Sequence, residues 1–242
     1  MPSRLPGLTV ASGLLRHPFD ETYGVRTSGL VAGRHLKSGH RHDRHATAYY
    51  GVAPSVFQSL LARWQRTRPA EPIERFTFVD IGAGMGRVML LASQMPFRQV
   101  LGVEFHPTLV GIARRNLTLW RKSGRACAPL RLTLGDATHF RFPPGPCVCF
   151  LFNPFGAPVM RRLLRHLTAT FADRPGQLDL LYVNNEQEGE LECLRGFRRL
   201  YLGKVRRSTQ DNRADRAILH HQPDGEYAAH PHEDCSIWRW FG

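Results

Sequence analysis

Three acidic residues lie at the ends of short apolar runs, and the first leads directly into a glycine-rich turn. That turn contains Gly82, Ala83, Gly84 and Gly86 and follows Asp80. Glycine tolerates positive φ angles and lets backbone amides approach a ligand that a Cβ would keep away. A strand, such a turn and a helix N-terminus together suit the binding of a nucleotide-like cofactor.

The spacing of the glycines and of the second acid narrows the choice of cofactor. A dinucleotide fingerprint would have its third glycine at position 87, where this chain has Arg87, and the earlier Gly86 favours S-adenosylmethionine over NAD. Glu104 follows Asp80 by 24 positions, about the distance at which a βαβ unit carries its ribose-binding acid. A carboxylate at that strand end can accept the protons of both ribose hydroxyls.

The block from Asp80 to Gly86 resembles motif I of class I S-adenosylmethionine-dependent methyltransferases, in which an acid and one apolar residue precede G-x-G-x-G. The resemblance implies that the glycine turn holds the methionine end of the cofactor, and that Asp80 bonds nearby backbone or the amino group. It also places an acid just after the third strand against the adenine amino group. Asp136 is the matching residue here, and the amide of Ala137 is a second expected contact.

The candidate reaction site is Asn153, Pro154 and Phe155, which follow the apolar run 148–152. Because ligands of open α/β sheets gather at the carboxyl ends of strands, these residues are expected beside the methyl group. With one proline in place of two, they resemble the Asn/Asp-Pro-Pro-aromatic motif of methyltransferases that act on adenine or glutamine nitrogen. They also resemble the Asn-Asn-Phe of non-SET histone-lysine methyltransferases. The resemblance implies that Asn153 and the backbone near Pro154 contact the cofactor and orient an amine, amide or hydroxyl, while Phe155 helps to exclude water.

Alternating strand-like and helix-like patterns position these residues. Strands are predicted at 76–81, 99–104, 130–134, 148–152 and 178–183, and helices at 87–95, 109–120, from 157 onward and at 190–194. A further helix is expected to begin at Ser55, with Gln58 completing a capping box. The segments 198–202, 217–220 and 237–240 compete for the last two strands.

The predicted fold is α/β, a Rossmann-like class I methyltransferase fold with a mostly parallel seven-stranded sheet and helices on both faces. Residues 53–242 are expected to form this domain. Residues 1–52 are expected to form an N-terminal extension that folds over the cofactor as a lid, in which Tyr23, Thr27 and Tyr50 are of interest. The stretch from 19 to 153 also resembles a family of uncharacterised bacterial class I methyltransferases. The matching pieces are 23–29, 50–55, the motif I block, 96–98 and 152–155.

Composition agrees with a single enzyme domain. The 242 residues include 42% apolar side chains, enough for one sizeable core. No run approaches the roughly 20 apolar residues that span a bilayer, residues 1–13 lack a secretory pattern, and five cysteines fit a reduced chain. A cytoplasmic protein without a membrane partner is predicted, and the sequence does not specify its oligomeric state.

A net charge of +13 leaves a nucleic-acid substrate open. Arginines cluster at 114–115, 121–125, 161–165, 195–199 and 206–207 and could concentrate RNA or DNA. Yet only Lys37, Lys122 and Lys204 are lysines, a skew that coding composition alone can produce. The leading hypothesis is methyl transfer to a nitrogen of a protein or a small molecule. Nucleic-acid methylation and a non-enzymatic Rossmann-like binding module are the alternatives.

Two clusters of histidines raise the question of a metal ion. They are His35, His40, His42 and His45 in one stretch, and His230 and His232 with Cys235 in another. Structural zinc sites use four ligands at established spacings, and neither cluster matches one. No metal site is predicted, and methyl transfer from a sulfonium needs none.

Overall fold

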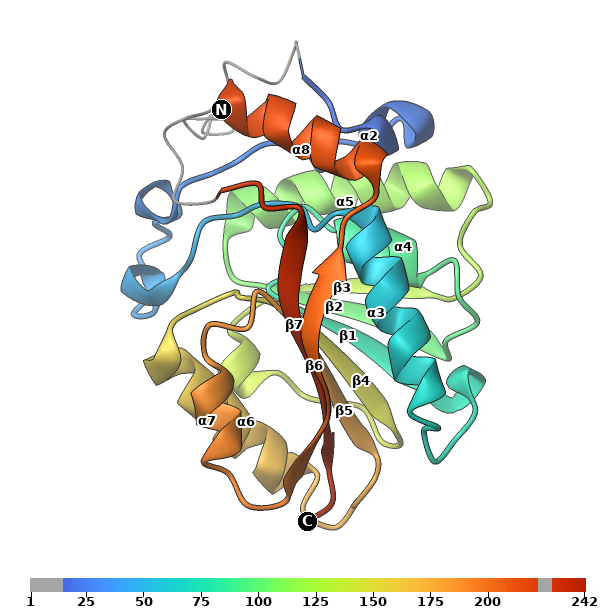
Figure 1. Cartoon of the computed structure of the whole chain (residues 1–242), viewed down its shortest axis with the longest axis vertical. Coiled ribbons are helices and arrows are strands. Elements are labelled where there is room, and N and C mark those ends of the chain that lie inside the picture. The colour runs from blue at the N-terminus through green and yellow to red at the C-terminus, as the bar shows by residue number, and fades with distance from the viewer. Residues whose placement is uncertain (1–14, 222–227) are drawn as a thin grey trace.

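The computed structural model describes residues 15–221 and 228–242, which are built around one seven-stranded sheet (Figure 1). The strands lie in the order β3-β2-β1-β4-β5-β7-β6. Strands β1 to β5 are parallel, whereas β7 runs antiparallel to both β5 and β6. Their bounds are β1 Thr77–Ile81, β2 Gln99–Glu104, β3 Leu130–Leu134, β4 Cys147–Phe152, β5 Leu178–Val183, β6 Phe197–Arg206 and β7 His232–Trp240.

Helices cover both faces of this sheet, with α3 and α4 on one side and α6 and α7 on the other (Figure 1). The α-helices are α2 Pro18–Tyr23, α3 Pro54–Arg66, α4 Arg87–Ala92, α5 Pro107–Lys122, α6 Ala157–Thr170, α7 Glu188–Glu192 and α8 Thr209–His220. Short 3-10 turns lie at Gly33–His35, Asp43–His45, Ile73–Arg75 and Ala137–His139. Because successive strand residues point to opposite faces, Phe78 packs in the core under α3, α4 and α5, and Val79 in the core under α6.

The predicted fold class is confirmed, as are the five predicted strands that precede β6. Their ends differ from the predicted ones by at most one residue, since β1 begins at Thr77 and β4 at Cys147. Strands β1, β4 and β5 are buried along nearly their whole length, so their sequences are continuous apolar runs. Within the described ranges, no helix has the length and apolar content needed to cross a membrane.

The structure decides one choice that the sequence left open and contradicts one local prediction. Residues 217–220 are the last turn of α8 and not a strand, and the remaining strands contain 198–202 and 237–240. An apolar run this short does not distinguish a strand from one face of a helix. Ser55 does not cap α3 either, because Ala53 is the N-cap residue and Pro54 opens the first turn. The Ser55 hydroxyl instead accepts from the amide of Ser208 at 2.9 Å.

Residues 15–52 pack against the domain and are joined to it at separate points. Arg87 donates to the hydroxyl of Thr27 at 2.7 Å and to the carbonyl of Gly51 at 3.0 Å. The hydroxyl of Tyr50 donates to Asp215 of α8 at 2.7 Å. This segment therefore contacts both the start of α4 and the helix that precedes β7.

Candidate cofactor and acceptor site

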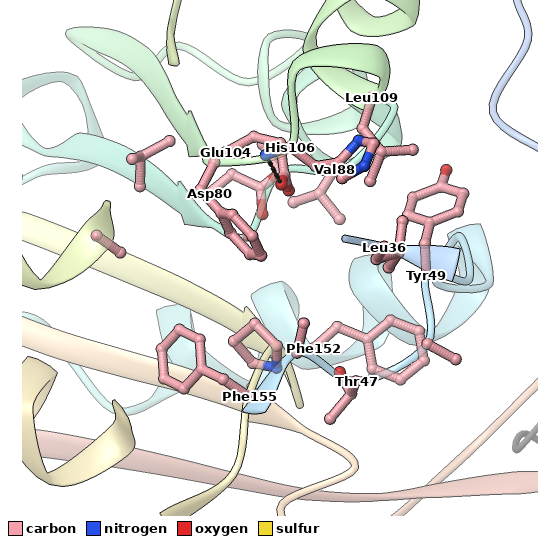
Figure 2. A pocket seen from close by; sticks show the side chains of 18 of the residues that line it. Leu36, Thr47, Tyr49, Asp80, Val88, Glu104, His106, Leu109, Phe152 and Phe155 are labelled. Carbon is pink, nitrogen blue, oxygen red and sulfur yellow. Dashed lines mark hydrogen bonds between the residues drawn. The ribbon is translucent and has the colours of Figure 1, made fainter. Parts of the chain in front are cut away.

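A pocket opens at the carboxyl ends of the parallel strands, where the segment 36–52 forms part of its wall (Figure 2). It includes about 980 Å³ of space, a figure that counts the solvent at its open mouth. Of the residues predicted to form the site, the pocket is lined by Asp80, Gly82, Ala83, Glu104, Asp136, Ala137, Pro154 and Phe155. Residues from four separate places in the sequence therefore meet where the chemistry was expected.

The glycines of the turn make different contacts. Gly82 (φ +76°) faces Pro154, whose Cβ would lie 2.7 Å from a Cβ added at position 82, so the turn touches the loop after β4. Gly84 (φ +52°) lies under the ring of Tyr49, which an added Cβ would overlap. Gly86 begins α4 and packs closely against α5. Gly84 and Gly86 are not among the lining residues. Gly84 instead contacts the segment 36–52, called the covering segment below, and Gly86 lets α4 pack closely on α5.

Asp80 and Glu104 are buried together in the pocket (Figure 2). Glu104 accepts from the amide of Gly84 at 2.9 Å and from that of His106 at 2.8 Å, one bond on each oxygen. Asp80 Oδ2 is buried and has no hydrogen-bond partner. Burial, with Glu104 nearby, raises the pKa of Asp80 well above its ordinary value, and burial raises the pKa of Glu104 against its amide bonds. A cationic or donating ligand group would be favoured here.

Asp136 follows β3 and presents its two oxygens differently. Oδ1 accepts from the amide and the hydroxyl of Thr138, both at 2.8 Å, while Oδ2 is buried without a hydrogen bond. His42 Nε2 lies 3.4 Å from Oδ2, and His40 Nε2 lies 3.7 Å from it. Burial acts to raise the pKa of Asp136, but the Thr138 bonds and the nearby His42 and His139 outweigh it and lower the pKa. Asp136 is therefore ionised at neutral pH.

The loop after β4 places its three predicted residues differently. Pro154 and Phe155 line the pocket, whereas Asn153 does not. Asn153 is buried in the left-handed region (φ +37°), and its Oδ1 accepts from the hydroxyl of Tyr182 at 3.4 Å. Its backbone carbonyl accepts from the hydroxyl of Thr47. The proline and the aromatic ring, rather than the Asn153 amide, border the pocket.

Three residues important to the pocket were missed in the sequence. Arg87 is buried and holds the covering segment, Tyr49 lies over the glycine turn, and His106 Nδ1 is a further buried lining atom without a hydrogen bond. Position 87 carried a signal, because an arginine stands where a dinucleotide fingerprint has glycine. Tyr49 and His106 carried none, since their contacts depend on distant parts of the chain.

The three residues of interest in the N-terminal extension are found in different surroundings. Tyr50 lines the pocket, and Thr27 accepts from Arg87. Tyr23 packs edge-on against Trp120, with 5.0 Å between the ring centroids, and does not line the pocket.

One group of described side chains, His40, His42 and Asp136, is close enough to hold a metal ion. The spacing of the histidines could not indicate this group, because its carboxylate, Asp136, follows β3 and is distant in the sequence. Two contacts oppose a cation. Arg162 Nη1 lies 3.5 Å from His42 Nε2, and His40 Nδ1 accepts the amide of His42 at 3.2 Å. The second contact leaves the proton of a neutral His40 ring on Nε2, the atom that faces Asp136.

Comparison with known sequences gives a short match. No protein-family model matches the chain. The chain is 37% identical over 73 residues to the adenine nucleotide translocase lysine N-methyltransferase of Mus musculus. That match covers 30% of this chain and 28% of the mouse protein, so the chain spans less than a third of its relative's length.

Comparison with solved structures concerns the whole fold. The [4+2]-cyclase SpnF aligns with a TM-score of 0.51 at 19% identity, over 76% of this chain and 80% of that one. TrmN from Thermus thermophilus aligns with a TM-score of 0.49 at 18% identity, over 78% of this chain and 49% of that one. The strand order, the antiparallel β7 and the likeness to SpnF show the Rossmann-like class I methyltransferase fold. Since SpnF is a cyclase by name, this fold alone does not decide the reaction.

Proposed function

We propose that this protein is an S-adenosylmethionine-dependent methyltransferase that acts on a nitrogen of a protein or small-molecule substrate. The observation that carries the proposal is the gathering, in one pocket, of buried polar atoms that make no hydrogen bond. Asp80 Oδ2 and His106 Nδ1 lack hydrogen bonds, Asp136 Oδ2 has only longer ionic contacts such as His42 at 3.4 Å, and all three residues line it. A buried polar atom that makes no hydrogen bond costs about 1–3 kcal/mol, so a ligand with matching polar groups would be strongly favoured.

The lining residues fit this cofactor along its length. Asp80 would hold the amino group, and its raised pKa fits a carboxylate that lacks a cationic partner. Glu104 keeps acceptor capacity on both oxygens and would take the ribose hydroxyls. Asp136 Oδ2 and the amide of Ala137 would take the adenine ring. Gly82 would lie against the methionine end, where a side chain would fill the space beside Pro154.

The acceptor nitrogen would bind at the end of the pocket bordered by Phe152, Pro154 and Phe155. When bound, S-adenosylmethionine supplies a methyl group already activated by a positive sulfur. The chain's part is to hold an unprotonated nitrogen in line and to exclude water, and alignment can contribute about 7–11 kcal/mol. The short likeness to a lysine N-methyltransferase supports a nitrogen acceptor.

Residues 15–52 would serve as a lid over this site. Tyr49 covers the glycine turn, and Ala46 pairs with Phe155 in an antiparallel bridge. Cofactor exchange would then require the segment to move. Hydrogen exchange at 46–52 should slow by at least tenfold when S-adenosylhomocysteine is added, and an unchanged rate would contradict the lid.

Calorimetry tests the proposed cofactor. S-adenosylmethionine and S-adenosylhomocysteine should bind the wild type with micromolar Kd, NAD should not, and Asp80→Ala should weaken binding at least tenfold. A folded wild type that binds neither sulfur compound would contradict the proposal.

Transfer of a labelled methyl group to lysine peptides then tests the acceptor site. Asn153→Ala should lower turnover by disturbing the loop that carries Pro154 and Phe155.

A further inference from the structure

A second recess lies beside the acceptor end of the pocket, and its polar lining consists of arginines and histidines. The recess encloses about 600 Å³ of space, a figure that includes its open mouth. Its lining residues are Arg41, His42, Arg44, His45, Pro158 and Arg162. The first four belong to the segment that covers the main pocket, and the last two to the first turns of α6. No acidic residue belongs to the lining.

Backbone contacts hold the two walls of this recess together. The amide of Gly156 donates to the carbonyl of His45 at 3.0 Å, and Ala46 forms its antiparallel bridge with Phe155. His42 lines both the recess and the main pocket. The recess therefore adjoins the place where the acceptor nitrogen is proposed to bind.

Two of the lining arginines, both exposed, contact imidazoles rather than carboxylates. Arg162 Nη1 lies 3.5 Å from His42 Nε2, and Arg44 Nε donates to His45 Nε2 at 3.1 Å. In the described ranges of the chain, neither Arg44 nor Arg162 has a carboxylate at ion-pair distance. The three lining arginines, 41, 44 and 162, are exposed, yet all three border one recess.

Asp136 offsets only part of the positive charge of this recess. Asp136 Oδ2 lies 3.8 Å from Arg41 Nη2 and can offset that single guanidinium. The remaining excess of positive charge opposes a metal ion and favours an anion. Guanidinium groups bind carboxylate and phosphate oxygens through paired N–H donors, which a compact ammonium cannot do.

We propose that this recess binds an anionic group of the methyl acceptor, a carboxylate or a phosphate. The substrate class is then a nitrogen nucleophile that carries negative charge close to the methylated atom. The link to a methyl acceptor rests on the proposed function, whereas the anion site is inferred from the recess alone. The lining comes from two short pieces of chain, 41–45 and the first turns of α6, which suits one anionic group rather than the long backbone of a nucleic acid.

Inorganic phosphate and acetate test the recess without reference to methyl transfer. Phosphate would be titrated at low ionic strength into the wild type, Arg44→Gln and Arg162→Gln, and followed by ³¹P NMR, with acetate followed by calorimetry. The matched control is Arg165→Gln, which removes an exposed arginine one turn further along α6 and outside the recess. Tenfold or greater losses of affinity are expected for the first two variants and less than twofold for the control. Equal affinities in Arg162→Gln and Arg165→Gln would overturn the site. Preference for phosphate or for acetate distinguishes the two anions.

Acceptor kinetics test the link to catalysis. With lysine peptides flanked by acidic residues, Arg162→Gln should raise KM at least tenfold with kcat within twofold, because a remote binding contact is lost. Peptides with neutral flanks should show no such change, and equal KM values for both peptides would overturn the link. Failure of the wild type to bind S-adenosylhomocysteine would contradict the proposed function instead. Oligonucleotide affinity that falls equally in Arg162→Gln and Arg165→Gln would indicate a diffuse nucleic-acid surface and overturn the recess.

Discussion

Buried carboxylates lie at both ends of the parallel strands, and their surroundings are opposite. At the amino end of β5, Asp179 accepts from Arg239 Nε at 2.7 Å, from Arg239 Nη2 at 2.9 Å and from the Trp64 indole at 2.6 Å. At the carboxyl end of β1, Asp80 is also buried, but it lies near the carboxylate of Glu104 and keeps one oxygen without a hydrogen bond. The first is surrounded by donors and the second is not.

The difference separates two uses of a buried charge. A carboxylate with a guanidinium and further donors holds parts of the chain together, and removing it leaves an uncompensated cation. A carboxylate beside another carboxylate works against folding, and such perturbed groups cluster at functional sites. The hydrogen-bond partners therefore distinguish a structural aspartate, Asp179, from a candidate functional one, Asp80, although both are buried.

Asp179→Ala should have the largest effect on stability. The variant leaves Arg239 and the Trp64 indole without their acceptor in a buried place, which costs about 3–5 kcal/mol. Urea unfolding measures this loss. Asp173→Ala, at an exposed position, is the control and should stay within about 0.5 kcal/mol. Similar midpoints for the two variants would remove the contrast.

Asp80→Asn should raise the stability of the folded protein and lower its affinity for S-adenosylmethionine. Because burial raises the folded-state pKa of Asp80, the wild type is most stabilised below the unfolded pKa of about 3.9. That stability is lost as pH rises through the folded pKa, and the uncharged variant escapes the loss. Its advantage in thermal unfolding should therefore grow from pH 4 upward. S-adenosylmethionine affinity should fall about ten- to hundredfold, the value of one hydrogen bond to a charged group. A variant less stable than wild type at neutral pH would contradict this.

Gly84→Ala tests whether the covering segment packs on the glycine turn at the carboxyl end of β1. An alanine there would overlap the Tyr49 ring at a positive φ, and we expect a loss of about 1–3 kcal/mol in the free energy of unfolding. Gly111→Ala is the matched control, since no atom lies within 4 Å of its added Cβ in α5. It should gain about 0.5–1 kcal/mol, because alanine favours a helix interior. A tolerated Gly84→Ala would show that Tyr49 does not rest on the turn.

Arg161→Ala should have the smallest effect. Arg161 pairs with Glu190 at 2.6 Å, but its side chain is 51% exposed, and such pairs contribute at most about 1 kcal/mol. Urea unfolding at low and high salt measures this contribution. A loss close to that of Asp179→Ala would show that ion pairing itself, and not burial, gives Asp179 its importance.

Local signals explain what the sequence predicted. Strands such as β1 and β4 are buried runs, and parallel strands bring their carboxyl ends to one edge, so Asp80, Glu104 and Asp136 were expected together. Contacts across long separations leave no such pattern. Arg87 bonds Thr27 across 60 residues, and neither side chain's surroundings can be read from its neighbours. The segment 217–220 remained a strand candidate for the same reason, since the short apolar face of α8 is defined by what it packs on.

The joint between the N-terminal segment and α8 also has a consequence for how the chain folds. His17 Nε2 lies 3.5 Å from Asp211 Oδ1, and Tyr50 reaches Asp215 across 165 residues. During synthesis the segment emerges early, yet it cannot complete its docking until α8 has left the ribosome. The cleft is therefore covered last, after the parallel strands have paired. In the reverse direction, we expect this joint to open first, so that the cleft meets water well before the sheet separates.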